Sequence, residues 1–445
     1  MLLDETHAPA ARAWLASANQ GGDFPLQNLP YGACRRKGSA EPFWVGVAIG
    51  DSALNLGALS QLPVWGALGP GQDAALAQRA AQAAAADSLN ALMALGPDAW
   101  QALRLALFRL LHADAAPAMQ RQLQACLTPL DDLEHQTAVR VGEYTDFYTS
   151  LHHARNVGQA IGNGGLVPPN FFWMPVAYHG RASSLGVNQQ VRRPVGQVMA
   201  PGAASPVVGP SQRLDYELEM AIYVGQGNAQ GTPVPVAQAE SHIFGLGLLN
   251  DWSARDIQFW EMAPLGPFQG KNFATTLSPW VVTLAALAPF RLPFERAPEF
   301  PPPLPYLDSP ALRDSGALDI ELSVTLQSAA MRGAGQAGET LSRTNFRHQH
   351  WCIAQMLAHH TLGGCNLRPG DLLGSGTVSG PTPAEAGALI ELSQAGQRPV
   401  ALRNGEHRAF LQDGDAIALN AWCERPGAVR IGFGSAQGEV LPALA

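Results

Sequence analysis

Three carboxylates alternate with apolar residues between Leu214 and Val224, and such a spacing could bind a cation. We expect this segment to be a strand, in which Asp215, Glu217 and Glu219 share one face, about 6.5–7 Å from one to the next. The row could be the solvated face of a half-buried antiparallel strand, which is the commoner case. It could also be one wall of an oxygen-ligand cage, because a hard divalent cation would offset the repulsion between the carboxylates.

An acid and two histidines lie close together between residues 144 and 153. Asp146 stands among aromatic residues, where it could stabilise a turn or bind a metal. His152 and His153 follow a few residues later. Histidine titrates near neutral pH and is the usual general base, although both side chains could instead satisfy backbone carbonyls.

Two further segments bring an acid together with potential donors. Asp251 ends an apolar run, and a helical turn beginning at Ser253 would place Arg255 and Gln258 on one face. This arrangement suits a binding site, but a capped helix with a surface ion pair would look the same. Lys271 lies in a loop rich in Gly and Phe, where it could serve the same site or be an exposed loop lysine.

The composition describes a compact globular protein with an acidic charge. The chain has 445 residues, of which 47% are hydrophobic and 14% charged, enough for two or three domains. A formal net charge of -8 and the lack of Lys/Arg-rich runs argue against a nucleic-acid partner. Five cysteines without a CxxC pair indicate a reducing compartment. With no signal-peptide pattern and no apolar run of about 20 residues, we expect a cytoplasmic protein without a membrane segment.

The elements that must position these groups change in character along the chain. The sequence pattern predicts two short strands around a turn in residues 42–57. It predicts helices in residues 72–127, one of them beginning at Pro97. From about residue 137, short β-rich runs are broken by Gly, Pro and Asn. We therefore expect an N-terminal domain over 1–136 and a mainly β catalytic domain over 137–445.

Seven blocks of the sequence, in the same order across nearly the whole chain, resemble the fumarylacetoacetase family of hydrolases. The blocks are FPLQNLPYGAC, YTDFYTSLHHARNVG, YHGRASSLG, LDYELEMAIYVG, HIFGLGLLNDWSARDIQFWE, PLGPFQGKNFATTLSPWVV and GCNLRPGDLLGSGTVSGP. The resemblance implies a small SH3-like N-terminal barrel with helices, followed by a large C-terminal β-roll, in a fold that is mainly β with some α. It also implies a homodimer and a divalent cation, Ca²⁺ or Mg²⁺.

The resemblance assigns roles to individual residues. It implies cation ligands at Asp146, Glu217, Glu219 and Asp251, with Lys271 and Thr275 also beside the cation. It implies a general base at His153, an acid orienting it at Glu391, and groups that stabilise negative charge at Arg255, Gln258 and Lys271. It implies substrate contacts at Tyr148, Tyr178 and Thr377, together with Arg255 and Gln258. Asp215 matches no ligand, and we expect it to serve the structure.

The chemistry of a β-diketo acid suits these residue types. Cleaving its carbon–carbon bond requires water to add to one carbonyl and an enolate to leave. A cation held by carboxylates can chelate both diketone oxygens and polarise the attacked carbonyl. His153 can take a proton from water if Glu391 fixes its tautomer. Well-placed donors such as Arg255 and Lys271 each contribute about 3–4 kcal/mol where charge develops.

Two positions depart from the family pattern. The loop 159–165 lacks the arginine that contacts the acidic end of the substrate, and Met262 stands where a substrate-contacting tyrosine is usual. Loss of such a partner costs a buried carboxylate about 2–5 kcal/mol in binding. Fumarylacetoacetate is the leading substrate. The alternatives are a diketo-acid hydrolase for another tail, a hydratase, isomerase or decarboxylase on the same fold, and a non-catalytic metabolite-binding protein.

Overall fold

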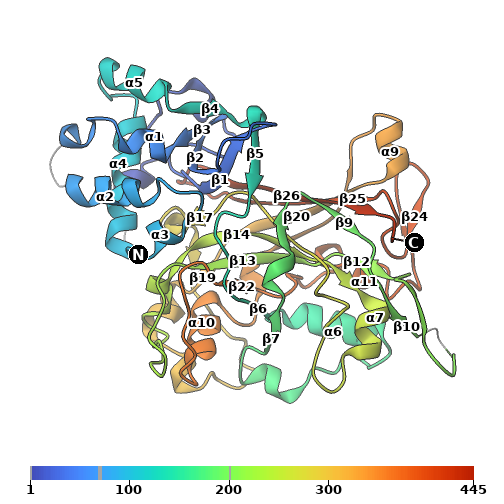
Figure 1. The fold of residues 1–445 in the computed structure, drawn as a ribbon. Coiled ribbons are helices and arrows are strands. Elements are labelled where there is room, and N and C mark those ends of the chain that lie inside the picture. Colours follow the sequence, from blue (N-terminus) through green and yellow to red (C-terminus); the bar gives the residue numbers. More distant parts are fainter. Residues whose placement is uncertain (1–2, 69–72, 200–201, 445) are drawn as a thin grey trace.

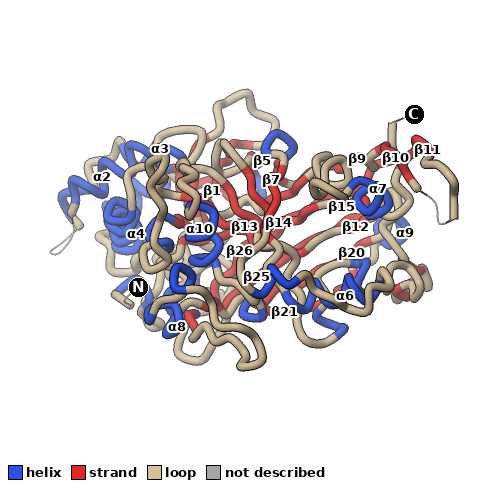
Figure 2. The backbone as a smooth tube through the Cα atoms, turned by 90° about the horizontal axis from the view of Figure 1, so that it is seen from below, coloured by secondary structure: helices blue, strands red, loops and turns tan. Residues whose placement is uncertain are grey.

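A computed structural model describes residues 3–68, 73–199 and 202–444. The chain forms a mixed α/β fold in which curled sheets are flanked by helices (Figure 1). In Figure 2 the strands run through the middle of the molecule, with the N-terminal helices at one end and α7 towards the other. Among the described helices, none is long and apolar enough to span a bilayer.

The described residues of the N-terminal part form one five-stranded sheet and five α-helices. The sheet has the order β4-β3-β2-β1-β5 and consists of β1 (Tyr31–Arg36), β2 (Trp44–Ile49), β3 (Ser52–Asn55), β4 (Leu127–Pro129) and β5 (Leu133–Gln136). The helices are α1 (Leu56–Ser60), α2 (Ala74–Ala83), α3 (Asn90–Met93), α4 (Pro97–Leu111) and α5 (Pro117–Gln124). The strand pair predicted over 42–57 and the helix predicted from Pro97 are both confirmed.

The larger part is built on two sheets. The first has the order β7-β6-β22-β13-β14-β16-β8, with β17 also paired to β14. Its strands are β6 (Tyr144–Phe147), β7 (Ala177–Gly180), β8 (Leu185–Val187), β13 (Leu218–Val224), β14 (Ile243–Asp251), β16 (Thr275–Leu277), β17 (Val282–Thr283) and β22 (Leu372–Gly374). The second has the order β21-β20-β25-β26-β9 and consists of β9 (Gln189–Arg192), β20 (Glu321–Gln327), β21 (Glu339–Asn345), β25 (Ala416–Cys423) and β26 (Ile431–Leu441).

Six α-helices and four small strand pairs complete this part within the ranges that the structure describes. The helices are α6 (Leu151–Ala160), α7 (Arg255–Glu261), α8 (Pro310–Ser315), α9 (Ala329–Gly333), α10 (Ile353–Thr361) and α11 (Leu389–Leu392). The pairs are β10 (Val195–Val198) with β11 (Val207–Pro210), β12 (Leu214–Asp215) with β15 (Ser253–Ala254), β18 (Arg291–Leu292) with β19 (Ala317–Leu318), and β23 (Val400–Ala401) with β24 (His407–Arg408).

The two sheets share one hydrophobic core. Met220 and Ile222 of β13 lie in the same buried cluster as Val324 of β20 and Leu419 of β25. Each such buried side chain contributes about 1.5–3 kcal/mol. Because side chains alternate along a strand, Glu219 lies on the opposite face of β13 and is free to join a polar site.

The acidic segment 214–224 is not the continuous strand that its alternation predicts. It divides into β12 and β13, and Glu217 lies between them. Its backbone N–H donates to the Asn250 side chain at 3.1 Å, and Glu217 bridges to Ala388 instead of extending the β13–β14 ladder. The change of pairing partner therefore breaks the expected strand.

Candidate active site

Four carboxylates from separate segments converge in the interior. Asp146 lies on β6, Glu217 precedes β13, Glu219 lies within β13, and Asp251 ends β14. One oxygen from each lies within 4.8 Å of the others, and all four side chains are buried. The solvated-face interpretation of the acidic row is therefore wrong.

Two of these carboxylates form no ion pair with any described residue. Burial and the nearby Asp251 raise the pKa of Asp146 well above its usual value, and burial together with Asp146 does the same for Glu219. Asp146 Oδ1 and Glu219 Oε1 accept no hydrogen bond from another described residue. This pair of orphaned oxygens therefore carries most of the electrostatic cost of the cluster.

The other two carboxylates are neutralised by buried cationic side chains. Lys271 Nζ donates to Glu217 Oε2 and, at 2.6 Å, to Asp251 Oδ2. Arg255 Nη1 lies 2.8 Å from Glu217 Oε1. Burial alone would raise the pKa of Glu217, but Lys271 and Arg255 outweigh it and lower that pKa below the usual range.

Gly374 leaves space beside the orphaned Asp146 Oδ1 and beside Glu219 Oε2, which accepts from the Gly376 N–H. A Cβ built on Gly374 would lie 2.5 Å from Asp146 Oδ1 and 3.0 Å from Glu219 Oε2. The donor set is entirely carboxylate oxygen, which hard divalent cations prefer. The residues present therefore fit a cation held by Asp146, Glu217, Glu219 and Asp251.

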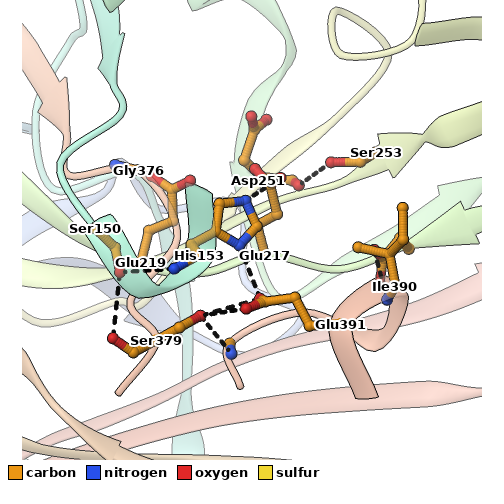
Figure 3. A network of polar contacts seen from close by, with 12 residues as sticks. Ser150, His153, Glu217, Glu219, Asp251, Ser253, Gly376, Ser379, Ile390 and Glu391 are labelled. Carbon is orange, nitrogen blue, oxygen red and sulfur yellow. Dashed lines mark hydrogen bonds and ion pairs between the residues drawn. The ribbon is translucent and has the colours of Figure 1, made fainter. Parts of the chain in front are cut away.

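A histidine–carboxylate pair lies directly beside the cluster (Figure 3). His153, in the first turn of α6, has Nδ1 2.7 Å from Glu391 Oε2 and Nε2 3.9 Å from Glu217 Oε1. The ring therefore lies between the orienting carboxylate of α11 and the carboxylate cluster. If Nδ1 carries the proton, Nε2 presents its lone pair towards the cluster.

Glu391 is itself held by two residues that sequence reasoning missed. Asn156 Nδ2 donates to Glu391 Oε1 at 2.9 Å, and Ser379 Oγ donates to both carboxylate oxygens at 2.9 and 3.0 Å. Burial would raise the pKa of Glu391, but His153 and these hydrogen bonds lower it. Asn156 was detectable, because it follows His153 by three residues and so shares its helix face.

Asp215 serves the structure, as expected, and takes no part in the carboxylate cluster. Its carboxylate accepts from Arg255 Nε at 2.9 Å and from the backbone N–H groups of Leu389 and Ile390 at 2.8 and 3.1 Å. One buried carboxylate thereby anchors both the arginine of α7 and the helix that carries Glu391. The predicted shared face of Arg255 and Gln258 is also confirmed, by a 3.1 Å hydrogen bond. The helix begins at Arg255, however, and not at Ser253, which lies in β15.

A cavity of about 450 Å³ opens from the cluster to the surface. Tyr148, Tyr178 and Thr377 line it with the catalytic candidates. Tyr178 OH donates to Asp251 Oδ2 at 2.9 Å, and the Tyr148 ring makes an edge contact with the His153 ring. The Thr377 hydroxyl, which is buried, has no partner among the described residues and can hydrogen-bond a ligand. Thr275 Oγ1 donates to Asp251 Oδ1 at 3.3 Å.

The mouth of the cavity is mostly apolar, with Asn163 as an exposed polar lining residue. Ile161, Leu166, Met262 and Leu265 line it, and Leu166 and Leu265 are 71% and 95% exposed. Among the described lining residues, Arg255 and Lys271 are the only Lys or Arg side chains, and both already contact carboxylates of the site. Residues of the loop without arginine and Met262 therefore both line this cavity.

The family models cover both parts of the chain. The model described as fumarylacetoacetate (FAA) hydrolase C-terminal matches residues 143–441, and the fumarylacetoacetase N-terminal model matches residues 27–138. The chain belongs to the fumarylacetoacetase family. Proteins named fumarylacetoacetase from Caenorhabditis elegans and Homo sapiens are 46% and 44% identical, over 96% of this chain and 98% of each relative. The one from Oryza sativa subsp. japonica is 44% identical over 95% of this chain and 96% of the relative.

The raised pKa values predict an unusual pH dependence of stability in the presence of a chelator. Asp146 and Glu219 favour the folded state fully below the ordinary carboxyl pKa of about 4, and this contribution is lost as pH rises through their folded-state values. Urea unfolding from about pH 5 to 9 should therefore show a steeper loss of stability for the parent protein than for Asp146→Asn. Equal slopes would contradict the electrostatic interpretation.

Gly374→Ala should weaken cation binding without unfolding the protein. The added methyl group occupies the space between Asp146 and Glu219, so calorimetric titration with Ca²⁺ or Mg²⁺ should show an affinity loss of about 10-fold or more. Gly363→Ala is the matched control, because a Cβ there meets nothing within 4 Å. Unchanged affinity in Gly374→Ala would place the cation elsewhere.

Proposed function

We propose that the protein is a metal-dependent hydrolase that cleaves a carbon–carbon bond in fumarylacetoacetate, releasing fumarate and acetoacetate. Family membership and 44–46% identity to named fumarylacetoacetases over nearly the whole chain support this activity. The observation that carries the mechanism is the position of His153 between Glu391 and the carboxylate cluster. No serine or cysteine nucleophile is needed.

His153 acts as the general base in this proposal. Glu391 accepts a hydrogen bond from the Nδ1–H group of His153 and so keeps Nε2 free to take a proton from water at the edge of the cluster. The resulting imidazolium is stabilised by the same carboxylate. When bound, a divalent cation would polarise the attacked carbonyl and neutralise Asp146 and Glu219. Water adds to that carbonyl, the carbon–carbon bond breaks, and the departing enolate takes up the proton held by the His153 imidazolium to become the ketone.

Arg255, Gln258 and Lys271 stabilise the negative charge that develops during this reaction. Arg255 pairs with Glu217 Oε1 and Lys271 pairs with Glu217 Oε2, so both positive groups are held rigidly before substrate binds. Such preorganised donors need little rearrangement in the transition state. Gln258, fixed by its hydrogen bond to Arg255, directs a polar group into the same cavity.

The remaining polar residues of the cavity orient the substrate. Tyr148, Tyr178 and Thr377 provide hydroxyl groups along the wall, and Thr275 supports Asp251 beside the cation. The apolar mouth offers no cation to the far carboxylate of the substrate, and that carboxylate can stay hydrated there. This arrangement avoids the cost of burying an unpaired charge.

The alternative activities are not favoured. An isomerase or decarboxylase consumes no water and has no need for a base–orienter pair that activates it. A hydratase would also use such a pair, but the curated relatives with 44–46% identity are named fumarylacetoacetase. A non-catalytic binder would use neither His153 nor Glu391. Specificity for a diketo acid with a different tail is supported only by the loop 159–165 without arginine and by Met262.

Several finer features of the family are part of the same proposal. We infer that residues 1–136 form the SH3-like N-terminal domain and residues 137–445 the catalytic β-roll. We also infer that the bound cation is Ca²⁺ or Mg²⁺, that two copies assemble as a homodimer, and that the enzyme acts in the cytoplasm. The carboxylate donor set supports the choice of cation, since both ions prefer oxygen ligands.

The purified protein should hydrolyse fumarylacetoacetate, followed by loss of the ultraviolet band of its enol. His153→Ala should lower kcat by about 10²–10⁴-fold, because water then lacks its base. His407→Ala, which removes an exposed histidine on β24, is the matched control and should leave kcat unchanged. Full activity of His153→Ala would rule out this mechanism.

Glu391→Gln should keep the fold and lose activity through the wrong imidazole tautomer. An amide can donate to Nδ1, which would leave the proton on Nε2, so kcat should fall by about 10²-fold or more while KM changes little. Ser379→Ala, which removes one donor from Glu391, should give a smaller loss. If Glu391→Gln raised KM alone, Glu391 would be a substrate contact and not an orienting group.

A further inference from the structure

The loop that presents Lys271 forms a single helical turn. The backbone N–H groups of Lys271 and Asn272 donate to the Phe268 carbonyl at 3.2 and 2.9 Å. The first N–H groups of such a turn have no partner within it, so something outside must satisfy them. How the turn is held decides where the Lys271 ammonium lies.

The first three backbone N–H groups of the turn belong to Phe268, Gln269 and Gly270, and one carboxylate accepts hydrogen bonds from all three. Glu261 Oε1 accepts from Phe268 N at 2.7 Å and from Gly270 N at 2.8 Å, and Glu261 Oε2 accepts from Gln269 N at 2.9 Å. Hydrogen bonds to an ionised acceptor are stronger than neutral ones, and three converging donors fix both position and orientation. Glu261 therefore caps the turn as an N-terminal residue caps a helix.

The same residue is the last one of α7, the helix that carries Arg255. The two elements also touch directly, because a Cβ on Gly270 would lie 2.8 Å from the backbone of Gln258, and Ala254 N donates to the Gly270 carbonyl at 2.8 Å. Glu261 thus joins the helix of one cationic donor to the loop of the other. The Arg255 guanidinium contacts one carboxylate oxygen of Glu217, and the Lys271 ammonium contacts the other.

We propose that Glu261 is a positioning residue that sets the place of the Lys271 ammonium relative to the Arg255 guanidinium. Glu261 is absent from the described lining of the cavity, so it acts through Lys271 and not on the substrate. The effect on catalysis rests on the proposed function of Lys271. The hold on the lysine does not, and it can be measured independently of activity.

The sequence offers a direct probe of this hold, since it contains only two lysines, Lys37 and Lys271. Lys271 is buried and Lys37 is exposed. Brief acetylation followed by peptide mass spectrometry should label Lys37 and spare Lys271 in the parent protein. Glu261→Gln replaces an acceptor oxygen by a donor and should raise Lys271 labelling, relative to Lys37, by about 10-fold or more.

Activity and a second variant complete the test. Glu261→Gln should lower kcat by about 10–100-fold with KM within about twofold, because a displacement of about 1 Å can cost 10²-fold in rate. Gly270→Ala should push the same loop away from α7 while Glu261 keeps its carboxylate. It should raise Lys271 labelling and lower kcat as Glu261→Gln does. Glu299→Gln, at an exposed position, should change neither.

When Lys271 is already replaced by Met, adding Glu261→Gln should lower the single-turnover rate by less than about a further twofold. Unchanged Lys271 labelling in Glu261→Gln, or raised labelling with unchanged kcat, would overturn the proposal. A full additional loss in the Lys271→Met background would also overturn it, because Glu261 would then act by another route. If the parent protein failed to hydrolyse fumarylacetoacetate, the proposed function would fall, and labelling would still decide whether Glu261 holds Lys271.

Discussion

Four carboxylates buried within 4.8 Å of one another are the constraint on which the rest of this structure depends. Ionised carboxylates lose several kcal/mol each on leaving water, and their mutual repulsion adds to that cost. Lys271 and Arg255 compensate one side of the cluster, at Glu217 and Asp251. On the other side, Asp146 Oδ1 and Glu219 Oε1 accept no hydrogen bond from a described residue, and burial together with the neighbouring carboxylates raises the pKa values of Asp146 and Glu219.

The scaffold resolves this constraint by bringing rigid elements to one point. Strands β6, β13 and β14 of one sheet supply Asp146, Glu219 and Asp251, and β22 lies between β6 and β13. Asp215 ties Arg255 to the helix of Glu391, so the cationic side of the cluster and the base–orienter pair share one anchor. Loss of either contact of Asp215 would therefore disturb both the charge compensation at the cluster and the proton transfer by His153.

The sequence predicted which residues would lie together better than it predicted their geometry. Asp146 and His153 lie in one short block, and Glu217 and Glu219 in another, so residue types and family resemblance sufficed to name them. Asp215 shares their alternation yet belongs to a different strand, because the ladder changes partner at Glu217. Periodicity cannot detect such a break, since it depends on Asn250 and Ala388, far away in the chain.

Gly374, Ser379 and Glu261 were missed for a related reason. Each acts through a contact with another segment: Gly374 by leaving space, Ser379 by holding Glu391, and Glu261 by capping the turn of Lys271. The most direct test of the account is the activity of the protein on fumarylacetoacetate after exhaustive chelation and stepwise return of Ca²⁺ or Mg²⁺. The carboxylate cluster predicts that activity disappears and returns in proportion to bound cation, with Glu219→Gln failing to recover. Full activity without any cation would contradict it.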